Sequence, residues 1–278
     1  MHAARNPDPD HVADIIRDIA ETHILPHFRA LSPGDIHEKT GPRDLVTVAD
    51  IEAEAALTRR LGALVPNALI VGEEAAAAHP AIIDGIAEAE ATWIIDPVDG
   101  TLNFSEGRET FAVIVAFVRN GVTVAGWIHA PLSGLTVMAE RGRGAWSGGR
   151  RLTVAPAAAL SAMNGALYIN RARAPAIFDR VKSARHRLGH LSHARCVGRE
   201  YLALAQGDNH FALFTRLMPW DHAAGALIHA EAGGHQALLD GGAYGPTVHQ
   251  GSLLLAPDAA SWEALKECLL DEDGGAAR

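Results

Sequence analysis

The segment Trp93 to Phe104, WIIDPVDGTLNF, places two carboxylates three residues apart directly after an apolar run. Asp96 ends the run, Pro97 removes a backbone donor and turns the chain, and Asp99 returns toward the same pocket. Two carboxylates this close repel each other, so either a cation lies between them or one stays protonated. Hard divalent ions such as Mg²⁺ take oxygen ligands of this kind. The spacing therefore predicts a metal site where a buried strand ends.

The next two residues add a feature suited to phosphate. Gly100 permits a backbone conformation closed to residues with a Cβ, and Thr101 opens a predicted helix. Helix N-termini present free N–H groups that favour anions, so one turn could hold a metal and a phosphoryl group side by side. The alternative interpretation is a surface Asp-Gly turn in which Asp99 only caps the helix.

Two other acidic sites support the first interpretation. Glu73 and Glu74 follow the apolar run ALIVG, and Asp221 stands behind Trp220 at a predicted helix start. Taken alone, the glutamates are typical of a solvated turn and Asp221 of an N-cap. Three acid-terminated elements in one chain instead favour a shared site.

A helix that starts at Asp50 as its cap is predicted before the first of these strands. Ile51, Ala55, Leu61 and Leu64 recur at helical spacing and are expected to share its buried side. The β-rich segment 110–154 contains the Asn-Gly pair at 120–121, a strong hairpin signal, and predicts an antiparallel meander.

Further strands and helices alternate beyond the meander. Strands are expected around 165–169, 210–215 and 252–256, and helices at 174–188, 221–232 and 260–270. Helices mixed with a meander favour a layered α/β or α+β sandwich. A frayed tail is expected at 271–278.

Composition excludes several classes of protein. Lys plus Arg is 24 against 33 for Asp plus Glu, a net charge of −9, which argues against nonspecific binding to nucleic-acid polymers. The two cysteines, far apart, exclude a disulfide framework and fit a reduced, cytoplasmic protein. Neither a signal peptide nor an apolar run of the roughly 20 residues that span a bilayer is found, so no membrane association is expected.

Four segments together resemble the inositol monophosphatase family of Mg²⁺-dependent, lithium-sensitive phosphatases. They are KTGPRDLVTVAD from Lys39, GEE from Gly72, DPVDGTLNF from Asp96 and WDHAAGALIHAEAGG from Trp220. The resemblance implies an αβαβα five-layered sandwich of the sugar phosphatase type, usually a homodimer. It implies one domain, 1–278, with a metal- and phosphate-binding half at 1–155 and a second α/β half at 156–270.

The resemblance also implies roles for the acidic residues, with two or three Mg²⁺ ions per site. The activating metal would be held by Glu73, Asp96, the carbonyl of Val98 and Thr101. A second metal would be held by Asp96, Asp99 and Asp221.

Other matching positions would serve catalysis and substrate binding. Asp50 would orient Thr101, Glu74 would support the attacking water, and Lys39 would lie on a mobile loop near the site. The backbone amides of Gly100 and Thr101 would bind phosphate. Water activated by a metal would attack phosphorus in line, and a second metal with water near Asp221 would stabilise and protonate the leaving alkoxide.

One position departs from the family's pattern. Inositol-specific members place an acidic residue seven positions before the Asp of the W-D motif, where this chain has Phe214. A phenyl ring accepts no hydrogen bonds from substrate hydroxyls. Arg216 is near enough in sequence to contact a second anionic group, and Arg199 and Glu200 fall where relatives line the substrate side.

The expected activity is hydrolysis of a small phosphorylated polyol or sugar, most closely of the inositol-1-monophosphatase type. Fructose-1,6-bisphosphatase, histidinol-phosphatase and 3′(2′),5′-bisphosphate nucleotidase activities stay open, as does a non-catalytic metal-binding relative.

A zinc site at His186, His190 and His193 is conceivable, but a solvated basic segment explains these residues better. Covalent catalysis finds little support, because a G-x-S-x-G motif is missing.

Overall fold

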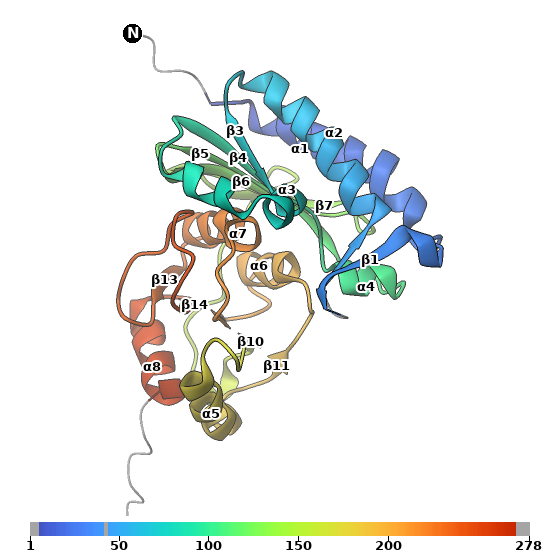
Figure 1. Cartoon of the computed structure of the whole chain (residues 1–278). Coiled ribbons are helices and arrows are strands. Elements are labelled where there is room, and N and C mark those ends of the chain that lie inside the picture. Colours follow the sequence, from blue (N-terminus) through green and yellow to red (C-terminus); the bar gives the residue numbers. More distant parts are fainter. Residues whose placement is uncertain (1–5, 42–43, 271–278) are drawn as a thin grey trace, which may run out of the picture.

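The computed structural model describes residues 6–41 and 44–270 and arranges them in alternating layers of helix and sheet (Figure 1). The predicted tail, 271–278, lies outside the described residues. Two larger sheets are present in the described parts, one of seven strands and one of five, and a two-stranded hairpin lies beside them. Helices pack on both faces of each larger sheet.

The outer layer of the first half is formed by α1 (Pro9–Ile19) and α2 (Val48–Leu64). Short helical turns connect α1 to the hairpin, at Ala20–Ile24, Leu25–His27 and Pro33–Asp35. The apolar residues of α1 and α2 pack against one face of the seven-stranded sheet, where Trp93, Phe117 and Trp127 are fully buried. Burial of these large aromatic side chains stabilises the packing of the helices on the sheet.

The seven-stranded sheet has the order β3-β4-β5-β6-β7-β8-β9. Its strands are β3 (Leu69–Gly72), β4 (Ala91–Asp99), β5 (Ala112–Arg119), β6 (Val122–Ala130), β7 (Leu135–Glu140), β8 (Gly144–Ser147) and β9 (Arg150–Arg151). Only β3 and β4 run parallel; β4 to β9 pair antiparallel in sequence order. The predicted meander is confirmed, and Asn120 and Gly121 both adopt the positive φ of a tight hairpin turn.

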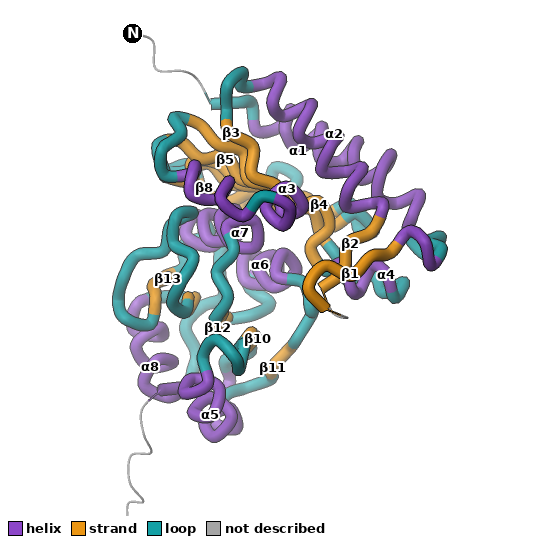
Figure 2. Tube along the Cα trace, viewed as in Figure 1, coloured by secondary structure: helices purple, strands orange, loops and turns teal. Residues whose placement is uncertain are grey.

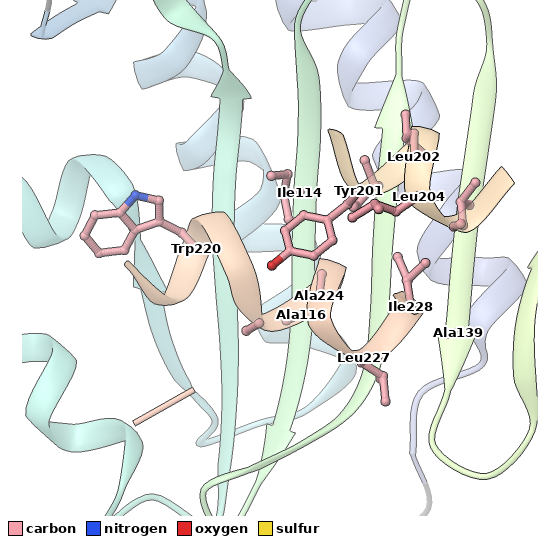
Figure 3. Close-up of a cluster of buried hydrophobic side chains, with 14 of the residues drawn as sticks. Ile114, Ala116, Ala139, Tyr201, Leu202, Leu204, Trp220, Ala224, Leu227 and Ile228 are labelled. Carbon is pink, nitrogen blue, oxygen red and sulfur yellow. The ribbon is translucent and has the colours of Figure 1, made fainter. Parts of the chain in front are cut away.

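The middle layer consists of α6 (Val197–Gln206) and α7 (Pro219–Glu231). Tyr201 on α6 and Ile228 on α7 belong to one buried apolar cluster with the strand residues Ile114 and Ala116 (Figure 3). Gly225 lies against the Tyr201 ring, so closely that an added Cβ would come within 2.2 Å of it. Small residues on α7 therefore let two helices and a sheet approach closely.

The second half contains the five-stranded sheet, in the order β11-β10-β12-β14-β13. Its strands are β10 (Gly165–Tyr168), β11 (Leu191–Ser192), β12 (Phe211–Phe214), β13 (His235–Leu238) and β14 (Leu253–Ala256). Along β12, Ala212 and Phe214 face the middle helices while Phe211 and Leu213 face α5 (Pro175–Ala184) and α8 (Ala259–Leu270). This completes five layers, and the predicted αβαβα sandwich is confirmed.

Two details of α2 differ from the sequence-based expectation. The prediction that Asp50 caps this helix is wrong: Thr47 is the N-cap, and Asp50 completes a capping box by accepting the Thr47 N–H. The predicted buried side is also wrong in part, since Ile51 is 51% exposed and Ala55 is exposed. The buried stripe keeps Leu61 but otherwise runs through other residues, among them Ala53 and Leu57, and Asp50 is buried with them.

The small hairpin and the short helix α4 lie beside each other near the end of β4. The hairpin joins β1 (Ile36–Gly41) to β2 (Asp44–Thr47), and β2 contacts α4 (Thr101–Ser105), as Figure 2 shows. Further short helices are α3 (Glu73–Ala78) and the turns Pro80–Ile86, Leu160–Ala162 and Arg185–Arg187. The sequence predicts helix over 75–91 with a loop at His79-Pro80, and α3 does end at Ala78, next to that loop, before the turn Pro80–Ile86. Among the described helices, none has the length and apolar character needed to cross a bilayer.

Candidate functional site

The parallel pair β3 and β4 brings the first two acidic sites together. Gly72 at the end of β3 pairs with Ile95, so Glu73 follows one strand where Asp96 continues its neighbour. The carboxyl ends of parallel strands meet at one sheet edge, and two carboxylates far apart in sequence thereby become neighbours. Burial, and after it the negative charge of Glu73, raises the pKa of Asp96 well above its usual value.

An irregularity in β4 sets the spacing of Asp96 and Asp99. Register with β5 is lost between these two residues, which lets the strand continue through Pro97 instead of ending there. Gly100 then turns the chain with φ 90°, and a Cβ there would lie 3.0 Å from the Thr110 carbonyl. This is the conformation expected for Gly100, and α4 begins at Thr101 as predicted.

Asp50 and Thr101 are joined as the resemblance implies. The Thr101 hydroxyl lies 3.2 Å from Asp50 Oδ1 and 3.0 Å from the Val98 carbonyl. The other Asp50 oxygen accepts from the Thr47 N–H and hydroxyl at 2.8 and 2.5 Å. Burial raises the pKa of Asp50 to about 6, against the opposing effect of its Thr47 bonds. The capping box thus fixes the carboxylate that faces Thr101.

Asp99 is bound by the N-terminus of α6, more than ninety residues later in the chain. Its Oδ1 accepts from the Val197 N–H at 3.1 Å, and Oδ2 accepts from the Gly198 N–H at 2.6 Å and the Cys196 thiol at 3.0 Å. Gly198 suits this position because an added Cβ would make a tight contact, 3.1 Å, with Asp99 Oδ2. Burial raises the pKa of Asp99 to about 6 despite these bonds.

Asp221 lies in the first turn of α7, two residues after the start of the helix, which was predicted to start at Asp221 itself, and it is not the N-cap that its pattern alone is typical of. The helix begins at Pro219, and Asp221 lines the cavity instead. Trp220 packs into the core. Burial raises the pKa of Asp221 well above its usual value, while the Arg216 charge opposes this shift. The Asp221 carboxyl is therefore available to a ligand.

Lys39 supplies a positive charge at the acidic edge. Its ammonium lies 2.9 Å from Glu73 Oε1 and 2.7 Å from Glu74 Oε1, and its side chain is only 11% exposed. The resemblance implied a loop, but Lys39 lies on the hairpin strand β1. Burial raises the pKa of Glu74 to about 7, although the bond from Lys39 opposes this.

Glu54, which the sequence reasoning missed, orients the glutamate pair. Its two carboxylate oxygens accept the N–H groups of Glu74 and Ala75 at 2.9 Å each. Gly72 leaves the space that this carboxylate fills, since a Cβ there would lie 2.2 Å from Glu54 Cδ. The available signal was its spacing from Asp50, four residues along α2, which places both acids on one helix face.

Four of the carboxylates described above line one cavity of about 340 Å³ between the two halves. Its acidic residues are Glu73, Asp96, Asp99 and Asp221, and its other lining residues are Leu45, Gly100, Thr101, Leu102, Tyr168, His193, Arg195, Cys196, Val197 and Arg216. The four carboxylates come from β4 and the first turns of α3 and α7. The sequence-predicted acids are thus brought together at one place.

The donor set suits a hard divalent cation. Asp96 Oδ1 is buried and makes no hydrogen bond, and its pKa is raised by burial and by the charges of neighbouring carboxylates. A cation would relieve both costs. Over residues 6–41 and 44–270, no three His, Cys, Asp or Glu side chains already form a group that could hold one ion. Glu73 is engaged by Lys39, and Asp99 by the α6 amides.

Two predicted substrate contacts are not among the residues that line the cavity. Phe214 is 1% exposed and packs in the core, with its ring 5.4 Å from Tyr168. Arg199, on the first turn of α6, does not line the cavity either. Four other predicted site residues do not line the cavity but contact its lining through the hydrogen bonds given above: Lys39, Asp50, Glu74 and Val98. The cavity wall nearest to Phe214 is instead formed by Tyr168.

Four residues of this wall were not identified as candidates from the sequence: Tyr168, Arg195, Cys196 and Val197. They lie in segments without a recognisable motif, and only the packing of the second sheet against the first half brings them to the acids. His193 belongs to the histidine group considered for zinc, and it lines the cavity singly. His229 is fully buried, and its Nε2 bonds the carbonyls of His235 and Ala256.

Comparison with known proteins agrees with the geometry. The model of the inositol monophosphatase family matches residues 10–272. The chain is 33% identical to a Thermotoga maritima fructose-1,6-bisphosphatase/inositol-1-monophosphatase, over 72% of this chain and 73% of the relative. It is also 33% identical to a Rhizobium meliloti inositol-1-monophosphatase, over 82% and 84% respectively.

The fold agrees as well. A crystal structure of an IMPase/NADP phosphatase complexed with Mg²⁺ and phosphate superposes with a TM-score of 0.80, covering 95% of each chain at 21% identity. An acidic cavity at the end of β4, a matching family model and this shared architecture lead to one conclusion: the chain belongs to the inositol monophosphatase family of phosphatases.

Proposed function

We propose that this phosphatase is a Mg²⁺-dependent phosphomonoesterase that acts on a small phosphorylated polyol or sugar, of the inositol-1-monophosphatase type. The observation that carries the proposal is the convergence of Glu73, Asp96, Asp99 and Asp221 on one cavity. Burial raises the pKa of three of these carboxyls, which is the electrostatic condition that a bound cation relieves.

Two sets of ligands are proposed for the metal. Glu73, Asp96, the Val98 carbonyl and Thr101 would hold the activating ion, and Asp96, Asp99 and Asp221 would hold the second. Divalent cations bound by such ligands make water a better nucleophile and neutralise charge on a phosphate. Lys39 would then give up its contact with Glu73. The related fold described with Mg²⁺ and phosphate supports this choice of ion.

The residues around the ions would position the reactants and move protons. The Thr101 hydroxyl would accept a proton from the attacking water while its own proton passes to Asp50, and Glu74 would support that water. The amides of Gly100 and Thr101 would hold the phosphate oxygens. Asp221, on the other side of the cavity wall, would orient the water that protonates the leaving oxygen.

Several rival activities are open within the same chemistry. They are hydrolysis of fructose 1,6-bisphosphate, histidinol phosphate or adenosine 3′,5′-bisphosphate, and the name of the Thermotoga relative supports the first of these. A non-catalytic role would predict a missing metal or water-activating position. Every proposed position, Glu73, Asp96, Thr101 and Asp221 among them, carries its oxygen ligand.

The test is phosphate release with and without Mg²⁺ from inositol 1-phosphate and the three rival substrates. The expected result is turnover that requires Mg²⁺ and is inhibited by Li⁺. Folded protein that hydrolyses none of the four would overturn the proposed substrate class. The homodimer implied by the family is checked on the same preparation by sedimentation.

A further inference from the structure

The second half of the chain contributes a cationic wall to the acidic cavity. His193, Arg195 and Arg216 all line the cavity and all are exposed. Within the parts of the chain that are described, neither guanidinium forms an ion pair with a carboxylate. Two unpaired arginines beside a cavity are therefore free to bind an anion.

The backbone holds Arg195 in a fixed position. Arg195 has φ 53°, a left-handed conformation that costs a non-glycine residue energy and persists only where its surroundings impose it. The Asn103 amide donates to the carbonyls of Ala194 and Arg195, at 2.9 and 3.3 Å. Glu200, which is 2% exposed, accepts the Ala194 N–H at 2.9 Å.

Glu200 links this segment to the rest of the wall. The Tyr168 hydroxyl donates to Glu200 Oε1 at 3.0 Å, and the His193 ring lies 4.4 Å from the Tyr168 ring. Arg216 is fixed from a different element: the His222 Nε2, in the core, bonds its carbonyl oxygen at 2.8 Å. The two arginines thus come from separate segments, each held by a buried side chain.

The chemistry of this wall suits an anionic group better than a polyol. A guanidinium donates in a fixed fork that matches phosphate oxygens and accepts nothing, whereas each hydroxyl also has a proton to donate. The scissile phosphate belongs, under the proposed function, at the end of β4 beside Asp96 and Gly100. The arginines stand on segments of the other half, and Phe214 in the core offers no acceptor.

We propose that Arg195 and Arg216, assisted by His193, form a subsite for a second phosphate group on the substrate. This inference rests on the proposed function and adds a preference for doubly phosphorylated molecules among its substrates. Two guanidinium groups and an imidazole N–H provide donors for the several oxygens of a phosphate dianion.

The experiment compares two substrates that differ only in the second phosphate, fructose 1,6-bisphosphate and fructose 1-phosphate. With Mg²⁺, kcat/KM is expected to favour the bisphosphate by at least about tenfold, the scale of one charge-assisted contact. Arg195→Ala and Arg216→Ala are each expected to reduce kcat/KM for the bisphosphate about tenfold while changing that for the monophosphate less than about twofold. Arg59→Ala, on an exposed turn of α2, is the matched control for loss of one charge.

Two kinetic outcomes would overturn the subsite. If the arginine variants lose kcat/KM equally on both substrates, the arginines bind the transferred phosphate. If the unsubstituted protein shows no preference for the bisphosphate, the cavity does not recognise a second phosphate. If neither sugar phosphate is hydrolysed, calorimetric titration of both compounds decides separately. Tighter binding of the bisphosphate that disappears in Arg195→Ala supports the subsite even if the proposed function fails, and equal binding refutes it.

Discussion

The Lys39 ammonium lies 2.9 Å from the carboxylate of Glu73, the residue proposed to help hold the activating cation. Its second partner, Glu74, lies 2.7 Å away, so one side chain neutralises two acids. The lysine and a divalent ion would therefore compete for the same carboxylate. Lys39 would therefore stabilise the protein in the absence of metal and weaken its affinity for metal.

Lys39→Met tests that competition. Without metal, the two glutamates lose their shared counter-charge, and we expect the free energy of unfolding in EDTA to fall by about 3 kcal/mol, the scale of a broken buried pair. The Mg²⁺ concentration that gives half-maximal thermal stabilisation is expected to decrease, because the competing cation is gone. Lys182→Met, on the exposed side of α5, is the control. Weaker Mg²⁺ binding by Lys39→Met would show that Lys39 supports the metal.

Asp96→Asn tests the centre of the acidic site. Asp96 is 1% exposed and lies among other carboxylates, so the amide removes repulsion and also removes a proposed ligand of both ions. We expect kcat with Mg²⁺ to fall by more than about 100-fold, beyond the usual cost of changing a residue that only supports a ligand. The melting temperature in EDTA is expected to rise. Asp179→Asn, exposed on α5, should change neither; full turnover by Asp96→Asn would refute its role.

Glu200→Gln tests the residue that holds the cationic wall. Four donors meet this carboxylate: Tyr168, Ala194, Ser192 and Asn209. An amide would turn one acceptor into a donor that faces other donors, so Tyr168 and the 193–195 segment should lose their positions. We expect KM to rise by about tenfold with kcat changed less than about threefold, and stability to fall by about 1–3 kcal/mol. The exposed variant Glu263→Gln is the control; a loss in kcat alone would place Glu200 in the chemical step instead.

His229→Gln tests a pH dependence of stability. Burial lowers the pKa of His229 from 6.5 to about 4, and its Nδ1 is buried without a partner, so a proton there would have no acceptor. The unfolded chain binds this proton between pH 6.5 and 4 and the folded chain does not. The contribution of His229 is therefore complete above pH 6.5 and is lost as pH falls toward 4.

The measurement is the free energy of urea unfolding from pH 4 to 7.5. In His229→Gln the rise of stability with pH should be less steep, by up to about 1.4 kcal/mol per pH unit within that window. Its overall loss of stability does not affect the slope. His11→Gln, an exposed histidine, should keep the unsubstituted slope, and an unchanged slope in His229→Gln would contradict the neutral state inferred for the core imidazole.

Local pattern was a good guide where the environment of a segment is simple. The meander from β5 to β9 follows from alternating apolar residues and from turns such as Asn120-Gly121. On α2 the pattern misled, because alanine at many positions blurs the contrast between the two sides of the helix. Ile51 was assigned to the core and is 51% exposed, while the buried side carries Asp50 and Glu54. A hydrophobic pattern does not identify polar residues that are buried for function.

The sequence by itself determined the acids and their local geometry: D-x-x-D-G-T fixes a strand end, a left-handed glycine and a helix start through backbone sterics within a few residues. Only the tertiary structure decided which distant groups meet them. Asp99 finds its hydrogen bonds at Val197 and Gly198, and the arginines reach the cavity from the second sheet. Those contacts depend on how two sheets pack across a shared helical layer, which is a property of the folded core and of no single segment.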